Sequence, residues 1–150
     1  MADTAATVYP VFNNVFKFGI GGLASTDQQM QTPANLENFA PTIDGTMEEW
    51  TPMESEGWGE SMMTGKKLSF DFSGKRTYGD AANDYIAGLA WKSGNDVVTK
   101  MEWTMPNGAS LKCDVVINVK APSGGDSTNI DKLEFTAQCK GKPVYTAPAA

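Results

Sequence analysis

The chain contains no histidine and only two cysteines among its 150 residues. It therefore lacks the usual general base at neutral pH, the imidazole ligands of most zinc sites, and the base of Ser-His and Cys-His nucleophile pairs. Carboxylates alone can also catalyse, but no two acids stand in a recognisable catalytic pattern. There is no Walker-type phosphate loop, and residues Gly19 to Gly22 do not complete a dinucleotide-binding fingerprint. We expect no enzyme, no metal and no cofactor.

Cysteine and long apolar runs are also scarce. Two cysteines do not make a disulfide scaffold. Cys113 and Cys139 stand in separate strand-like runs, where buried apolar packing is the simplest interpretation, and a disulfide or metal role stays open. The first seven residues lack the basic start and apolar run of a signal peptide, and no stretch approaches the roughly twenty apolar residues of a membrane span. We expect a protein made in a reducing cytoplasm.

Positive charge is the next deficit. Twelve bases face 18 acids, a net charge of −6, and the bases form no stripe along the chain. This argues against binding DNA through its phosphates. A hydrophobic content of 41% with 20% charged residues indicates a folded chain, and 150 residues allow one domain, or one domain with an arm.

Residues 65–95 predict a strand, a basic turn and a helix. Leu68, Phe70 and Phe72 alternate with polar residues, which is typical of a strand with one apolar face. Asp80 is a candidate N-cap, and Gly94 a candidate stop for the helix. The expected apolar face of the helix consists of Ala82, Tyr85, Ile86 and Leu89.

Three further strands follow the helix. Residues 99–105 and 111–119 flank Asn107-Gly108, a two-residue hairpin signal, and residues 132–140 form the last run. Each run is apolar on one face, as in antiparallel sheets with one solvated side. The sequence thus predicts a mainly β fold, a β-sandwich or half-barrel with one flanking α-helix. The expected core residues are Met101, Trp103, Met105, Leu111, Cys113, Val115, Ile117, Val119, Leu133, Phe135, Ala137 and Cys139.

Residues 1–42 predict less structure. Phe16 and Phe18 are spaced to face one side of a short strand, whereas residues 25–42 are polar, contain two prolines and indicate a loop. A loop of this length is unusual in a compact domain. An arm that packs on a neighbouring copy and a mobile terminus explain it equally well, so we divide the chain into an arm or loop region, 1–42, and a β domain, 43–150.

Residues 44–64 hold the excess negative charge. They contain no base, and the twelve acids outside them balance the twelve bases of the chain. The acids are Asp44, Glu48, Glu49, Glu54, Glu56 and Glu60. Gly57 and Gly59 flank Trp58, which suggests a long acidic hairpin that presents an aromatic side chain at its tip. A charged loop with its tryptophans folded onto the core is the alternative.

Residues 43–146 resemble the major tail tube proteins of long-tailed bacteriophages. The resemblance is carried by TGKKLSFDFSGKRTYGDAANDYIAGLAWKSG (64–94), KMEWTMPNG (100–108), CDVVINV (113–119) and the SGGDSTNID turn before LEF (123–135). It implies a structural virion protein whose inner sheet closes into a β-barrel within a hexameric ring. Rings stack into the tail tube, assembled in the host cytoplasm, through which DNA is ejected. The implied partners are further copies of the chain, a tape-measure protein, tail terminator and tail-tip proteins, and DNA in transit.

The strand faces opposite the predicted core are the candidates for the lumen of such a tube. They are Lys67, Ser69, Asp71, Lys112, Asp114, Asn118, Lys132, Glu134 and Gln138, with Glu48 and Glu49 as additional acids. A wall without excess positive charge would let DNA slide, whereas a basic wall would bind it. The candidates for contacts between subunits or rings are Glu54, Glu56, Trp58, Glu60, Met62 and Met63, and the basic pair Lys75 and Arg76, whose reversal to Glu is expected to impair assembly without unfolding the subunit.

Three alternatives remain open from the sequence. The first is the inner tube of a contractile, phage-like injection system, which uses a similar subunit. The second is a carbohydrate-binding β-sandwich that presents Trp50, Trp58, Trp91 or Trp103 to sugars. The third is a head decoration or tail-completion protein, which would share the fold class without polymerising.

Overall fold

The structure is a computed structural model that describes residues 6–148. The expectations for the first seven residues and for the region 1–42 therefore lie partly outside it. The strands are β1 Val15–Gly19, β2 Met30–Gln31, β3 Leu36–Trp50, β4 Glu60–Lys75, β5 Val98–Thr104, β6 Ser110–Ala121, β7 Lys132–Cys139 and β8 Val144–Thr146. The α-helix is α1 Ala81–Gly88, and the 3-10 turns are η1 Val11–Asn13, η2 Gly22–Ala24, η3 Asp27–Gln29, η4 Met53–Ser55, η5 Leu89–Trp91 and η6 Gly94–Val97.

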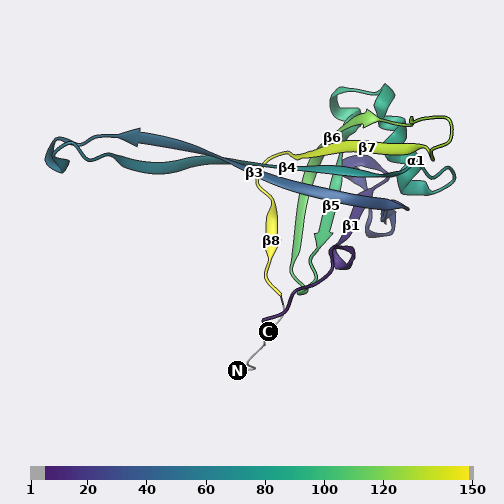
Figure 1. The fold of residues 1–150 in the computed structure, drawn as a ribbon, viewed down its shortest axis with the longest axis horizontal. Helices are drawn as coiled ribbons and strands as arrows, with labels where there is room; N and C mark the ends of the chain where they lie inside the picture. Colours follow the sequence, from purple (N-terminus) through teal and green to yellow (C-terminus); the bar gives the residue numbers. More distant parts are fainter. Residues whose placement is uncertain (1–5, 149–150) are drawn as a thin grey trace.

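The strands form one antiparallel sheet in the order β2-β1-β5-β6-β7-β4-β3, and β8 pairs with the start of β6 (Figure 1). The predicted mainly β fold with a flanking helix is confirmed. Because a single continuous sheet carries all the strands, the half-barrel describes the subunit better than a sandwich of two separate sheets. The sheet is not closed in the subunit, and β2 and β3 are its edges.

The sheet curls around an aromatic core. Phe16 on β1 lies 4.7 Å from Phe39 on β3 and 4.9 Å from Phe72 on β4, measured between ring centroids. These strands stand near opposite ends of the strand order, so only strong curvature brings their side chains together. The prediction that Phe16 and Phe18 share one face of a strand is confirmed, since both are buried.

The helix begins as predicted but ends early. Asp80 caps it, accepting a hydrogen bond from the Asn83 backbone N–H at 3.0 Å. Ile86 and Leu89 enter the core as expected, while the chain tightens into η5 after Gly88, a residue that disfavours helix. The prediction that Gly94 stops the helix is therefore wrong; with φ of +65° it opens η6.

The β5–β6 hairpin contains the predicted turn with a different length. Gly108 donates to the Met105 carbonyl at 3.0 Å, and Met105 donates to the Ala109 carbonyl at 2.8 Å. Three residues, 106–108, thus lie inside the Met105–Ala109 pair that closes the hairpin, and only Gly108 has positive φ (94°). The expected two-residue turn is wrong because a type I turn needs a third, left-handed residue to rejoin the twisted strands.

The prediction of a loop over residues 25–42 is wrong for β2, Met30–Gln31, and for residues 36–42. Residues 36–42 are the start of β3 and pair with β4, from Leu36↔Gly74 to Thr42↔Ser69. An edge strand pairs with a neighbour on one side only, so it does not need a backbone N–H donor at every position. Pro41, which lacks this N–H, is therefore tolerated there. The polar composition of residues 36–42 therefore gave no signal of a strand.

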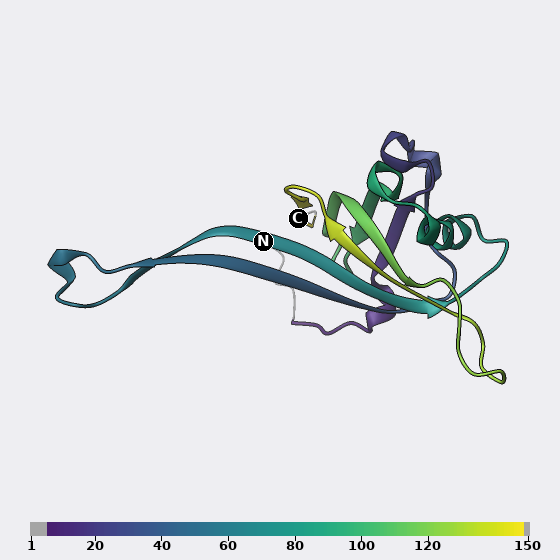
Figure 2. The same cartoon turned by 90° about the horizontal axis from the view of Figure 1, so that it is seen from above.

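The longest feature of the subunit is a two-stranded arm. β4 pairs with β7 only over Ser69–Lys75, so residues 43–68 pair only within the β3–β4 hairpin. Figures 1 and 2 show this arm projecting far from the body. Its tip contains η4, and Glu56 and Gly57 there take φ of 55° and +92°. The predicted acidic segment lies within this arm.

Gly74 is a position where the fold demands glycine. A Cβ there would lie 2.8 Å from the Leu36 Cα, and closer still to the Asn35 carbonyl oxygen. Both obstacles are backbone, which cannot move aside without breaking the Lys75 N–H to Asn35 carbonyl bond of 2.9 Å.

We therefore expect Gly74→Ala to destabilise the subunit by about 1–3 kcal/mol, as for other overpacked sites. Thermal unfolding measures this loss. Gly59→Ala is the matched control, because a Cβ there meets only the Trp50 carbonyl at 4.0 Å. Equal melting temperatures for the two variants would contradict the expectation.

Candidate assembly surfaces

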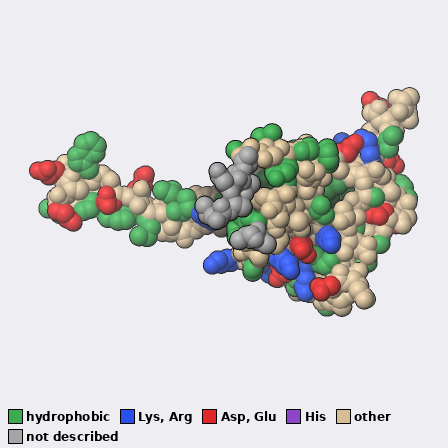
Figure 3. Space-filling view, turned by 90° about the horizontal axis from the view of Figure 1, so that it is seen from below, with side chains coloured by type: hydrophobic (Ala, Val, Ile, Leu, Met, Phe, Trp, Pro, Cys, Tyr) green, Lys and Arg blue, Asp and Glu red, His purple; other side chains and the backbone are tan. Residues whose placement is uncertain are grey.

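The arm exposes an unusual combination of apolar and acidic side chains. Met53 and Trp58 are 98% and 79% exposed, and Trp50 is 46% exposed. No ion pair within residues 6–148 involves an acid of the arm. Figure 3 shows hydrophobic and acidic side chains alternating along the arm. Soluble monomers rarely expose contiguous apolar surface, so the arm has the character of an interface.

The structure places eight of the nine strand-face lumen candidates on the sheet face opposite the core, whereas Lys67 lies at the root of the arm, where β4 has no β7 partner. Ser69, Gln138 and Val116 stand in one cross-strand row, and Asp71, Thr136 and Asn118 in the next. The nine residues are exposed, apart from Ser69 and Glu134, which are half-buried. Sequence reasoning did not nominate Lys120 and Thr136, although they alternate with the core residues of the same strands.

Charges on this face neutralise one another. The Lys120 ammonium lies 3.3 Å from Asp71 Oδ1, and Lys112 stands opposite Glu102 in the β5–β6 register. The pKa of Asp71 is lowered because the Thr136 hydroxyl donates to its carboxylate, with a further contribution from Lys120. The face therefore carries mixed signs without a basic track. Glu48 and Glu49 lie on the arm, where neighbouring residues point to opposite sides, so one flat surface holds only one of them.

The predicted basic pair is already engaged within the subunit. Arg76 is nearly buried, with its NH1 atom 2.7 Å from Asp84 Oδ1 and its guanidinium 4.1 Å above the Tyr78 ring. Lys75 contacts Glu37 at 3.1 Å. Reversing Arg76 would remove these contacts, so the double reversal is expected to cost stability as well as assembly. A role of the pair between subunits stays a prediction.

The pKa of Asp84 is lowered from 3.8 because the Arg76 guanidinium donates to it, assisted by the Gly79 N–H. Its contribution to stability is therefore present above pH 3.8 and is lost as the pH falls through the lower pKa of the folded state. We expect Asp84→Asn to melt below the wild type at pH 7, with a difference that shrinks as the pH falls through the lowered pKa of Asp84 in the folded state. Melting curves across this range test it; a constant difference would contradict it.

The helix N-terminus is joined to two other segments by one buried side chain. Asn83 donates from Nδ2 to the Lys75 and Ala34 carbonyls at 3.0 and 3.3 Å, and its Oδ1 accepts from Arg76 and Thr77. Sequence reasoning missed this junction, because an asparagine inside a helix gives no signal of partners 49 residues away. The junction places the helix beside the start of β3 and the end of β4, at the end of their ladder opposite the arm.

The two cysteines form a close pair. Their Sγ atoms lie 2.9 Å apart, Cys113 on β6 and Cys139 at the end of β7, and both side chains are half-buried. The pKa of Cys139 is lowered by the hydrogen bond with Cys113, and that of Cys113 is raised well above its ordinary value by the same contact and by burial. Both cysteines pack against the core, as expected. Their proximity also places the two thiols where oxidation could join them in a disulfide.

We expect hydrogen peroxide to convert the two thiols into an intramolecular disulfide, releasing two water molecules per peroxide reduced. The thiolate of Cys139 is the form that reacts first. Intact mass spectrometry would show the loss of two hydrogens and of both alkylatable thiols, restored by dithiothreitol. Cys113→Ser is the control, and sulfinic acid formation without crosslinking in the wild type would contradict the expectation.

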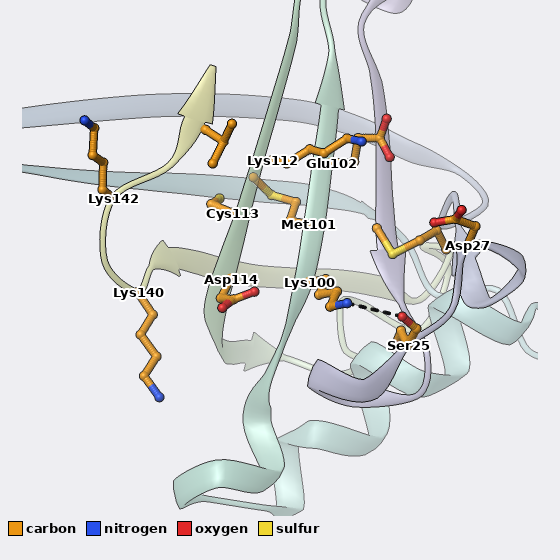
Figure 4. A pocket seen from close by; sticks show the side chains of 12 residues that line it. Ser25, Asp27, Lys100, Met101, Glu102, Lys112, Cys113, Asp114, Lys140 and Lys142 are labelled. Carbon is orange, nitrogen blue, oxygen red and sulfur yellow. Dashed lines mark hydrogen bonds between the residues drawn. The ribbon is translucent and has the colours of Figure 1, made fainter. Parts of the chain in front are cut away.

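Two hollows flank β6 at its end nearest the arm. Figure 4 shows the first, about 390 Å³, where Lys100 reaches the Ser25 carbonyl at 3.4 Å and Lys140 and Lys142 extend from the chain after β7. Its lysines are interspersed with Asp27, Glu102 and Asp114, so it selects neither sign of charge.

Within residues 6–148, no cluster of three or more His, Cys, Asp or Glu side chains could hold a metal ion. None of the helices described there is long and apolar enough to span a membrane.

The tryptophans are not gathered into a sugar platform. Trp103 stacks on Phe16 with ring centroids 5.6 Å apart, and its indole N–H donates to Asn14 at 3.0 Å. Trp50 and Trp58 lie on the arm, and Trp91 is exposed in η5, after the helix. No observation on the described residues favours the carbohydrate-binding alternative.

Comparison with known proteins identifies structures that share this fold. Neither a family model nor a curated protein matches the chain. Among solved structures, it is similar to a chain in the tail of an empty gene transfer agent particle with C6 symmetry, at 14% identity and a TM-score of 0.75, over 93% of this chain and 100% of that one. It is also similar to a chain in the virion of a native gene transfer agent particle, at 16% identity and a TM-score of 0.69, with the same coverage of both chains. At these identities the likeness shows a shared fold.

Proposed function

We propose that the protein is a structural subunit of a phage-like tail, which assembles into stacked hexameric rings that form the tail tube. The observation that carries the proposal is the match of the whole fold to a chain in a tail with C6 symmetry, over 93% of this chain. The resemblance of residues 43–146 to tail tube proteins agrees with it.

The open sheet supports ring formation. β3 presents a long edge at one end of the sheet, and β2 is the edge at the other. Exposed edges aggregate unless they are paired or covered, and joining identical neighbours around a closed ring pairs every edge. In such a ring the inner sheets form a β-barrel, and the face opposite the core lines the lumen.

The charge of that face suits the passage of DNA. Duplex DNA carries one negative charge per roughly 1.7 Å of its axis, so a basic wall would bind it. The face instead pairs Lys120 with Asp71 and Lys132 with Glu134, at 3.3 and 3.8 Å. Mixed pairs give little net attraction, and salt screens the remainder beyond about 10 Å. The tube then acts as a conduit for DNA ejection without sequence-specific binding.

The exposed arm supplies the contact between rings or subunits in this assembly. Trp58, Met62 and Met63 provide apolar area there, and Glu54, Glu56 and Glu60 provide charge. The remaining partners are the proteins that end or fill a tail: a tape-measure protein, a terminator and tip proteins. The protein is then located in the virion tail, after assembly in the host cytoplasm.

Negative-stain electron microscopy of the purified protein tests the proposal. We expect six-fold rings or tubes at high protein concentration, alone or after addition of partner tail proteins. A chain that stays monomeric under all of these conditions would overturn the tube assignment and favour a head decoration or tail-completion role.

A further inference from the structure

The second hollow beside β6 is an apolar groove at the root of the arm. It measures about 710 Å³ and is lined on its apolar side by Ile43, Leu68, Leu111 and Pro143. Ile43 is 66% exposed, and Leu68 is only half-buried at the margin of the core. At the root of the arm, apolar side chains at the margin of the core are thus accessible from the groove.

Three lysines border this groove, Lys66, Lys67 and Lys142. None of them forms an ion pair with another side chain of residues 6–148. No carboxylate lines the groove, in contrast to the mixed pocket on the other side of β6. Asp44 stands opposite Lys67 across the β3–β4 ladder without forming an ion pair with it, so the groove combines an apolar floor with a rim of net positive charge.

The tip of the arm has the complementary character. It presents Trp58 and Met53, both strongly exposed, beside Glu54 and Glu56. The acids of the arm are unpaired within the described chain, as are the lysines of the groove. Figure 3 shows the acidic side chains along the arm and basic ones only from its root onward.

The tip of a subunit does not reach its own groove. Ile43, Lys66 and Lys67 belong to the root of the arm, and the tip begins beyond Trp50. At about 3.3 Å per strand residue, the seven steps from Ile43 to Trp50 separate the two surfaces by roughly 23 Å. An arm tip that fills the groove therefore belongs to a second molecule.

We propose that the Lys66–Lys67–Lys142 groove is the docking site for the arm tip of another copy of this chain, with Trp58 and Met53 on the apolar floor and Glu54 and Glu56 against the lysines. The contact is heterologous, because tip and groove are different surfaces, so it propagates from copy to copy into a ring or a filament. It rests on the proposed tube function and specifies which surface receives the arm.

A charge swap tests the pairing. The groove variant is Lys66→Glu with Lys67→Glu, the tip variant is Glu54→Lys with Glu56→Lys, and the third protein carries all four changes. At low salt we expect each double variant to raise the concentration needed for assembly at least tenfold. The fourfold variant is expected to recover most of that loss, because opposite charges again face each other. Sedimentation and electron microscopy measure assembly, and circular dichroism confirms folding.

The control is Lys92→Glu, a charge reversal at an exposed lysine that lies after η5, outside the groove and outside the sheet. It is expected to assemble like the wild type. If the wild type forms tubes and both reversals leave assembly unchanged, or if the fourfold variant fails to recover, the docking proposal is overturned and the tube function stands. A wild type that never assembles overturns the proposed function itself.

Discussion

Replacing residues 51–59 by an Asn-Gly turn is expected to abolish tube assembly and to leave the subunit folded. Trp50 and Glu60 are paired across the hairpin, so a two-residue turn closes it where the ladder already ends. The deleted segment includes Met53 and Trp58, which are exposed and therefore contribute little to the core. The fold should thus survive the loss of the tip.

The expected loss is large because the tip is repeated in every subunit. A buried tryptophan anchor contributes about 2 kcal/mol or more to one contact, which is already more than a tenfold change in affinity. The assembled fraction by sedimentation, with melting temperature as the folding control, gives the result. Trp91→Ala is the matched control, since Trp91 is 82% exposed but lies away from the arm. Tubes formed by the shortened protein would show that the tip is dispensable.

Substituting Asn83 by alanine is expected to be the most destabilising single change outside the aromatic core. Asn83 is 1% exposed and satisfies the carbonyls of Ala34 and Lys75 together with donors from Arg76 and Thr77. Each buried polar group that loses its partner costs about 1–3 kcal/mol, and a group that water can reach costs less. We expect a total loss of about 2–4 kcal/mol.

Chemical denaturation of the subunit at a concentration too low for assembly measures this loss. Asn95→Ala removes an exposed asparagine and is expected to change stability by less than about 0.5 kcal/mol. If the two substitutions have similar effects, the helix N-terminus is not held by Asn83 in the way the hydrogen bonds indicate.

The contrast between these two regions explains why some features were predictable and others were not. The arm carries its signal locally, in acids without bases and in a tryptophan between glycines. The Asn83 junction joins residues 34, 75–77 and 83, and the pairing of Cys113 with Cys139 spans 26 positions. Such contacts form only after the sheet has curled, so the local residue pattern along the chain does not predict them.

Corrections to the predicted elements follow the same logic. Local alternation identified the strands around Phe70, Val115 and Phe135, since each buries one face. It did not identify residues 36–42, because only Leu36 and Phe39 of this edge segment pack against the core and the ladder with β4 holds the rest. The helix stop failed for the opposite reason, since the chain leaves the helix at Gly88 to pack Leu89 on the core, well before Gly94.

The sequence by itself determined the fold class, the one-sided strands, the helix start and the concentration of negative charge in the arm. These depend on periodicity, capping and composition, which act over a few residues. Only the tertiary structure decided that Arg76 is bound within the subunit and that Lys66, Lys67 and Lys142 border one apolar groove. The arm root and the loop after β7 are far apart in the chain, and only the folding of the sheet brings these charges together.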